Sequence, residues 1–214
     1  MNVTLIGDQS DIGKALKPLL EADGHEVVGW HRYQNIPDKP WNLVILCVGK
    51  VGPVGNWWEQ KEIGANIESN LLLPFRVMQY LWPYKLPDAS VCFMAGSNPQ
   101  KIMKGYASYN VSKMALLKLC EQLDYESPEC KFFALGPGYM DTKIHNATKE
   151  KNWPNPRIKA GNPGKIEDVY ETLKWCWSQP KEVVGGRNIC VSDIKSGRIY
   201  NSITEDVFKL RRVE

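Results

Sequence analysis

The chain has 214 residues, of which 43% are hydrophobic and 24% are charged, and its 27 basic and 24 acidic side chains leave a formal net charge of +3. A chain of this length buries one core of ordinary size, so we expect a single domain spanning residues 1–214. The balanced, scattered charge gives no argument for a nucleic-acid partner, and no apolar run approaches the roughly 18 residues that a membrane span needs.

Neither an export signal nor a metal site is expected. The chain runs from Met1 directly into an apolar stretch, without the basic segment and long apolar core of a signal peptide. Its six cysteines are scattered and none has zinc-ligand spacing, so we interpret them as reduced thiols in a soluble cytoplasmic protein. The three histidines lie in separate segments and form no catalytic or metal cluster by spacing.

Taken in chain order, short β-branched and apolar runs alternate with longer helical segments. The runs typical of strands buried on both faces are residues 3–6, 26–28, 43–46, 91–94, 131–135 and 188–191. Helical periodicity covers residues 12–22, 64–81, 107–123 and 166–177. Pro18 is expected to bend the first of these helices without breaking it. The alternation predicts a Rossmann-like α/β fold, a doubly wound parallel sheet covered on both sides.

A glycine-containing turn follows the first strand and leads into the first helix. Gly7 allows a tight turn there, and Gly13 allows the helix to pack close to the strand. The helix amino terminus presents free N–H groups, which favours a dinucleotide diphosphate over the alternative of a turn without ligand. Asp11 stands where a middle glycine is expected, and its carboxylate is unfavourable near a phosphate unless it points away. The candidate cofactor-binding residues of this turn are Gly7, Gln9, Ser10, Asp11, Ile12 and Gly13.

The second strand is followed by His31 and Arg32, near the place where an acidic residue binds the adenosine ribose in NAD-binding folds. No acid is present, and a basic residue can pair with a 2′-phosphate, so we expect NADP as cofactor, with NAD as the alternative. The competing interpretation is that Arg32 is an ordinary solvated surface residue.

Tyr109 and Lys113 are four residues apart, so on a helix they occupy the same face. A cation at ~4 Å, with an effective dielectric of ~20, supplies about 4 kcal/mol, enough to move a tyrosine pKa from about 10 to near neutrality. One lysine could thus make a tyrosine a proton donor and acceptor at neutral pH. A Tyr-x-x-x-Lys pair also arises by chance on protein surfaces.

The whole pattern resembles the short-chain dehydrogenase/reductase family, and the resemblance runs from Met1 to about Ser192. The order of the features carries it more than any single motif does. In chain order these features are the glycine turn, the strand followed by Val48 and Gly49, Asn70, Ser97, the pair Tyr109 and Lys113, and the segment 137–142.

The resemblance implies a role for each of these residues. Tyr109 would transfer a proton while a hydride moves between the nicotinamide and the substrate carbon, and Lys113 would hold the nicotinamide ribose. Ser97 would hydrogen-bond the substrate oxygen, and Asn70 would brace a helix distortion and a water-linked proton path. Besides Tyr109 and Lys113, the resemblance implies cofactor contacts for Val48, Gly49, Pro137, Gly138, Met140 and Thr142.

The sequence departs from the family at three places. A strict count from Tyr109 puts Gly96 at the usual position of the catalytic serine, so either Ser97 fills that role after a small loop shift or no serine does. The family's Asn-Asn-Ala-Gly is replaced by residues 46–49, which begin with Leu46 and Cys47. Only residues 33–42 separate the second strand from the next one, so we expect one edge strand and its helix to be missing and the adenine pocket to be open.

The leading hypothesis is an NADP(H)-dependent oxidoreductase that interconverts a carbonyl and an alcohol on a small-molecule substrate, with Tyr109 as general acid/base. The alternatives are a weakly active or inactive nucleotide-binding regulator of the same fold, and a nucleotide-sugar-modifying enzyme. The family commonly packs the helices of Asn70 and Tyr109 against a second subunit, which implies a homodimer or homotetramer. Four aromatic residues are expected either to line a substrate pocket or to form lids and subunit contacts: Trp57, Trp58, Tyr139 and Trp153.

Overall fold

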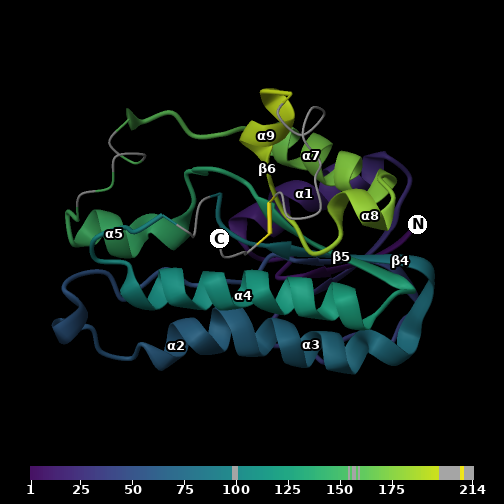
Figure 1. Ribbon diagram of the computed structural model, residues 1–214, viewed down its shortest axis with the longest axis horizontal. Helices are drawn as coiled ribbons and strands as arrows, with labels where there is room; N and C mark the ends of the chain where they lie inside the picture. Colours follow the sequence, from purple (N-terminus) through teal and green to yellow (C-terminus); the bar gives the residue numbers. More distant parts are fainter. Residues whose placement is uncertain (98–100, 154, 156–157, 159, 198–207, 210–214) are drawn as a thin grey trace, which may run out of the picture.

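The computed structural model of the protein describes residues 1–97, 101–153, 155, 158, 160–197 and 208–209 (Figure 1). Within them, a six-stranded parallel sheet has the order β2-β1-β3-β4-β5-β6. Every run predicted to be a strand is confirmed, although Val191 begins a helix instead of ending the last strand. The strands are β1 (Asn2–Ile6), β2 (Glu26–Trp30), β3 (Trp41–Leu46), β4 (Lys85–Met94), β5 (Cys130–Gly136) and β6 (Asn188–Cys190).

Helices cover both faces of this sheet, as Figure 1 shows. One face carries α1 (Asp11–Ala22), α7 (Ile166–Ser178), α8 (Lys181–Val184) and α9 (Val191–Lys195). The other face carries α2 (Gly64–Ile67), α3 (Leu73–Leu81) and α4 (Ala107–Glu126), while the short α5 (Asn146–Glu150) lies beyond the sheet. The predicted Rossmann-like, doubly wound architecture is therefore confirmed.

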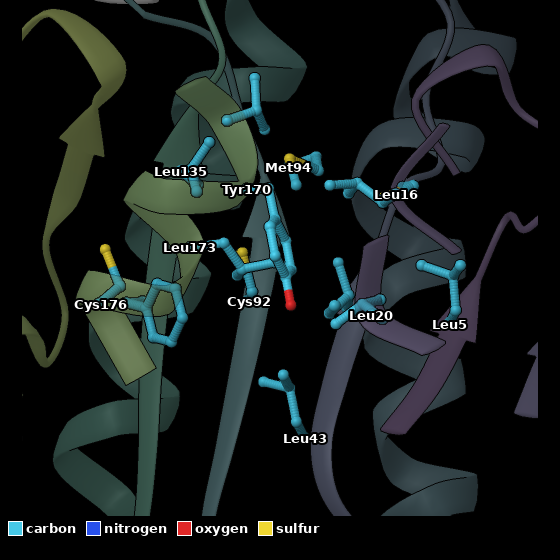
Figure 2. Close-up of a cluster of buried hydrophobic side chains, with 14 of the residues drawn as sticks. Leu5, Leu16, Leu20, Leu43, Cys92, Met94, Leu135, Tyr170, Leu173 and Cys176 are labelled. Atoms are coloured by element: carbon cyan, nitrogen blue, oxygen red, sulfur yellow. The ribbon is translucent and has the colours of Figure 1, made fainter. Parts of the chain in front are cut away.

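Alternate residues of each strand enter two separate cores. In β3, Leu43 and Ile45 face the core under α1 and α7, whereas Val44 and Leu46 face the core under α3 and α4. Figure 2 shows the first core, in which Tyr170 and its α7 neighbours meet the leucines of α1 above the strands. Strands buried on both faces are apolar at most consecutive positions, which explains why they stand out in the sequence as hydrophobic runs.

The sheet ends at β2 on one side, as the short connection predicted. Residues 31–40 join β2 to β3 without a helix or a strand, and the structure describes all of them. The expected loss of an edge strand and helix is thus confirmed. Helix α1 runs unbroken through Pro18, because its buried face at Leu16 and Leu20 packs on the sheet and outweighs one lost backbone bond.

The predicted helix over residues 64–81 consists of three joined pieces. Between α2 and α3, residues Glu68–Leu72 adopt a π-helical turn, which places an irregularity in the backbone at Asn70. Among the described residues, no helix is long and apolar enough to cross a membrane. The same part of the chain holds no group of three His, Cys, Asp or Glu side chains that could bind a metal ion.

Candidate active site

A cavity of about 700 Å³ opens at the carboxyl ends of the central strands. Its walls follow β3 at Cys47, β4 at Ala95 and β5 at Pro137, and the first turn of α1 forms one lip. Open parallel sheets bind their ligands at this edge. The predicted site residues that line the cavity are Ser10, Asp11, Ile12, Val48, Gly49, Ser97, Tyr109, Lys113, Pro137, Gly138, Met140 and Thr142.

The glycine turn brings the α1 amino terminus close to the strands. Gly7 has a φ of +83°, and a Cβ there would meet the carbonyl oxygen of Cys47 at 2.8 Å. A Cβ at Gly13 would overlap the carbonyl oxygen of Gly7, and Ser10 Oγ caps the helix by accepting from Gly13 N at 3.0 Å. Only glycine fits at both points, and the resulting cradle suits a dinucleotide diphosphate at the helix terminus.

Gly7, Gln9 and Gly13 lie behind the cavity lining and shape the turn from outside it. Gln9 Nε2 donates to Asp8 Oδ2 at 3.2 Å, and Asp8 is only 8% exposed because its side chain packs against Gly29 of β2. Asp8 belongs to the turn in the sequence but is not among its predicted cofactor-binding residues. Its one sequence signal is Gly29, since a glycine inside a strand marks a close approach by another group.

His31 and Arg32 also lie outside the cavity lining. They follow Trp30, whose carbonyl oxygen accepts a hydrogen bond from Gly7 N at 2.7 Å, so they stand beside the glycine turn. Arg32 is exposed, and its guanidinium carbon lies 5.0 Å from the ring centroid of Tyr33. The structure thus leaves this arginine exposed, close in the chain to the residue that bonds the glycine turn.

Tyr109 and Lys113 come from the first turns of α4 and both line the cavity. Lys113 is 3% exposed, and its Nζ donates to the carbonyl oxygen of Met94 at 2.8 Å. Burial lowers the pKa of the Lys113 ammonium to about 8, against a smaller opposing effect of the nearby Cys47. A Cβ at Gly49 would lie 3.3 Å from Lys113 Nζ, so this glycine lets the loop approach the ammonium group.

Two asparagines on one helix pair with two serines on another. Asn70 Nδ2 donates to Ser112 Oγ at 2.9 Å, and one helical turn earlier Asn66 Nδ2 donates to Ser108 Oγ at 2.7 Å. Asn70 also holds the loop after β3, since its Oδ1 accepts from Lys50 N and its Nδ2 donates to Lys50 O, both at 2.8 Å. We call this set of bonds the Asn–Ser ladder.

The Asn–Ser ladder reaches the backbone of the tyrosine turn. Ser112 Oγ donates to the carbonyl oxygen of Tyr109 at 2.8 Å. Asn66, Asn70 and Ser112 are fully buried, so these bonds are shielded from water. Asn70 itself lies outside the cavity lining. It is linked to the lining through the loop after β3, which it bonds at Lys50, and through Ser112, which bonds the Tyr109 carbonyl. The sequence-based prediction did not include Asn66, Ser108 or Ser112. The two asparagines are four residues apart, as are the two serines, which is the spacing of one helix face.

Ser97 lines the cavity, but its oxygen is already engaged. Ser97 Oγ accepts from Gly138 N at 2.6 Å, a bond that still leaves the hydroxyl proton for donation to a ligand. The backbone on either side is fixed by β6, because Asn188 Nδ2 donates to Gly96 O and Cys190 Sγ donates to Ser97 O. The structure therefore puts Ser97 at the cavity, as the shifted-loop interpretation requires.

The first turn of α1 and the loop after β5 touch across the cavity at Asp11 and Lys143. Asp11 Oδ2 accepts from the backbone N–H of Lys143 at 2.7 Å, and Asp11 Oδ1 lies 3.5 Å from Lys143 Nζ. The carboxylate therefore points across the cleft toward the loop after β5. On the same wall, burial lowers the pKa of the His145 imidazole, which packs against the ring of Tyr139.

The four aromatic loop residues take different positions. Tyr139 lines the cavity, whereas Trp57 and Trp58 line a neighbouring groove of about 580 Å³ and are 72% and 66% exposed. Trp153 covers Gly105, and its Nε1 donates to Lys104 O at 2.6 Å. Only Tyr139 of this set is therefore a wall of the cavity that holds Tyr109.

Comparison with known proteins gives a family and a fold. The sequence model of the family described as "Enoyl-(Acyl carrier protein) reductase" matches residues 50–193. No curated protein matches the sequence significantly.

Solved structures resemble this one over most of its length. The aldohexose dehydrogenase of Thermoplasma acidophilum, in ligand-free form, is 17% identical, with a TM-score of 0.74 over 89% of this chain and 92% of its own. A small-chain dehydrogenase in complex with NADPH is 15% identical, with a TM-score of 0.77 over 89% of this chain and 95% of its own. A short-chain dehydrogenase of Shigella flexneri complexed with NADP is 14% identical, with a TM-score of 0.72 over 89% and 97%.

At these identities the structural likeness establishes the fold, and the sequence match over more than half of the chain establishes the family. Both agree with the order of motifs around the cavity. The chain belongs to the short-chain dehydrogenase/reductase family of NAD(P)-dependent oxidoreductases.

Proposed function

We propose that the chain is a single-domain, NADP(H)-dependent oxidoreductase that interconverts a carbonyl and an alcohol on a small molecule, with Tyr109 as general acid/base. One observation carries the proposal. Tyr109, Lys113 and Ser97 line the same cavity as the α1 amino terminus and the loop after β5. A proton-transferring group and a dinucleotide cradle in one cleft are the two parts that such a reaction needs.

NADP is the proposed cofactor for two reasons. The chain just after β2 carries Arg32 and no acidic residue, so a 2′-phosphate bound beside the end of β2 would meet a cation. Related structures of the same fold were solved with NADPH or NADP. The residues proposed to hold the nicotinamide half are Val48, Gly49, Lys113, Pro137, Gly138, Met140 and Thr142, all of which line the cavity.

In the proposed reduction, Tyr109 Oη donates a proton to the substrate oxygen, and in the oxidation it accepts one. The bound coenzyme supplies or accepts the hydride at the substrate carbon. Ser97 Oγ donates a hydrogen bond to the same substrate oxygen while Gly138 N fixes its position.

Lys113 would act on both partners of the reaction. Its ammonium is held by Met94 O and has two further protons, which can bond the nicotinamide ribose. Its charge would favour the phenolate form of Tyr109 in a site of low dielectric. Because the pKa of Lys113 is about 8, the ammonium form still predominates at pH 7.

The test is a titration of the purified protein with NADPH and NADH by fluorescence, followed by turnover on a panel of carbonyl compounds beside Tyr109→Phe. We expect NADPH to bind more tightly than NADH, with turnover that depends on the Tyr109 hydroxyl. Binding without turnover on a broad panel would favour the nucleotide-binding regulator. Failure to bind either nucleotide would contradict the proposal.

We also propose that the protein is a homodimer or homotetramer that associates through α3 and α4. These helices and the π-helical turn expose large apolar side chains, which on a soluble protein often mark an interface. Light scattering coupled to size exclusion should give twice or four times the mass of one chain, and a monomer at micromolar concentration would refute the assignment. The exposed side chains are Leu72, Phe75, Tyr80, Val111 and Tyr125.

A cytoplasmic location is proposed from the cysteines. All six are buried thiols that form no disulfide within the described residues. Free thiols are typical of proteins in reducing compartments, whereas exported proteins more often pair them. Imaging of a fluorescent fusion, or fractionation with a cytoplasmic marker, would test this, and recovery outside the cytoplasm would overturn it.

A further inference from the structure

The contact between Asp11 and Lys143 joins two loops that belong to distant strands. Asp11 begins α1, directly after the turn that follows β1, and Lys143 lies in the loop after β5. In the sheet, β3 and β4 separate these two strands. Neighbouring strands are spaced by about 4.8 Å, so β1 and β5 stand roughly 14 Å apart. A hydrogen bond of 2.7 Å between their loops therefore bridges the cleft above β3 and β4.

The position of this bridge coincides with the proposed path of the coenzyme. Asp11 and Lys143 both line the cavity, next to the capped amino terminus of α1. That terminus is the anion-binding end of the cradle, where the dinucleotide diphosphate is proposed to lie. Lys143 could serve a diphosphate through its backbone N–H and its ammonium, but Asp11 engages both groups.

We propose that the Asp11–Lys143 pair is a clasp over the coenzyme cleft, and that the diphosphate must displace Asp11 from Lys143 to bind. This inference rests on the proposed function and identifies Asp11 as a residue that sets coenzyme affinity. The Asp11 side chain is 35% exposed and that of Lys143 is 63% exposed, so the carboxylate can turn toward water. Exposed ion pairs are weak, which makes the clasp reversible.

The clasp also explains an anomaly in the sequence. The family's phosphate turn has a glycine where this chain has Asp11, and a carboxylate beside a diphosphate is repelled by its charge. Paired with Lys143, the carboxylate is tolerated while the cleft is empty. When the diphosphate is bound, the same carboxylate would weaken the complex and speed its release. Since NADPH and NADH share the diphosphate, the effect should be equal for both.

The experiment compares coenzyme binding by the full-length wild type, Asp11→Asn and Asp11→Gly. Asp11→Asn keeps an acceptor for the Lys143 N–H and removes the charge, whereas Asp11→Gly removes both. Asp141→Asn is the matched control, because Asp141 forms a 2.7 Å ion pair with Lys149 in the same loop region but does not line the cavity. Dissociation constants for NADPH and NADH would be measured by fluorescence titration, and association rates by stopped flow.

We expect both Asp11 variants to bind NADPH and NADH about three- to tenfold more tightly, the change that removing one nearby like charge produces at moderate salt. Association should be faster, and Asp141→Asn should stay within about twofold of the wild type. Lys143→Met should have the opposite effect and weaken both coenzymes.

Unchanged or weaker binding in Asp11→Asn, with a wild type that binds NADPH, would overturn the clasp and leave the proposed function standing. Tighter binding in the variants from a wild type that binds poorly would support it. If neither the wild type nor any Asp11 variant binds either nucleotide, the clasp and the proposed function both fail.

Discussion

At the Tyr109 end of the cavity the polar side chains are buried and bonded to one another, whereas at the α1 end they are exposed and pair across the cleft. Asn66, Asn70, Ser112 and Lys113 are at most 3% exposed, while the Asp11 and Lys143 side chains keep about a third or more of their surface. Breaking a buried hydrogen bond costs about 1–3 kcal/mol, and an exposed ion pair contributes about 0–1 kcal/mol. The first end can therefore fix the geometry of the chemistry, and the second can adjust coenzyme affinity.

The largest expected effect is at the buried end. Tyr109→Phe removes one hydroxyl and keeps the ring that packs beside Tyr106. If this hydroxyl transfers the proton, turnover should fall by at least about 10³-fold, near the upper range for a general acid/base. The NADPH dissociation constant should stay within about twofold. A variant with more than a tenth of wild-type turnover would show that another group moves the proton.

At the exposed end, Arg32→Ala should change the choice of coenzyme. We expect NADPH affinity to fall by roughly tenfold, because one charge-assisted contact to the 2′-phosphate is lost. NADH affinity should change by less than about twofold. Fluorescence titration of both nucleotides measures the ratio, and equal losses for the two would remove the phosphate role from Arg32.

A smaller effect is expected from the Asn–Ser ladder. Ser112→Ala breaks the bonds to Asn70 Nδ2 and to the Tyr109 carbonyl without touching the cavity. We expect kcat to fall by about five- to tenfold with little change in KM, and stability to fall by about 1–2 kcal/mol. Ser112→Thr keeps the hydroxyl and should recover most of the loss. Equal rates for the alanine variant and the wild type would show that the ladder does not position Tyr109.

The smallest expected effect is the pH dependence of stability due to Lys113. Its usual pKa of 10.5 is lowered by burial to about 8, so between these values the unfolded chain binds the proton that the folded chain has lost. Stability contributed by this group therefore rises with pH. From pH 7 to pH 9 the wild type should gain about 1 kcal/mol relative to Lys113→Met.

Chemical denaturation of both proteins at the two pH values measures this difference. Comparing the two proteins cancels the contribution of Cys130, whose thiol pKa is raised by burial away from Lys113 and acts in both alike. A constant difference across this range would mean that Lys113 is not desolvated in the folded protein.

The sequence predicted the fold well because burial on both faces leaves a strong pattern. Residues 43–46 of β3 and 132–135 of β5 are apolar throughout, and the segments between the strands have helical periodicity. The missing edge strand was equally visible, since residues 33–42 are too few for a helix, a strand and a second helix. The ends of elements were harder to predict, as at Val191, because the start of a helix depends on local hydrogen bonds such as the one that Cys190 N donates to Asp193 Oδ2.

The site was predicted in part. Twelve of its residues line one cavity because motif order fixes which strand end each one follows, and strand ends meet at one edge of the sheet. Hydrogen bonds between side chains and distant segments left only weak signals in the sequence. The link from Asn66 to Ser108 spans 42 residues, and the one from Asp11 to Lys143 spans 132. Such contacts depend on how the helices and loops meet in space, which the spacing within one segment does not determine.

The most direct test is a crystal structure of the protein bound to NADPH. We predict that the diphosphate lies at the amino terminus of α1 and that Lys113 Nζ bonds the ribose of the nicotinamide. The nicotinamide ring should face Tyr109 Oη and Ser97 Oγ, with room between them for a small carbonyl compound. A nucleotide bound elsewhere, or a Tyr109 hydroxyl turned away from the nicotinamide, would contradict the account.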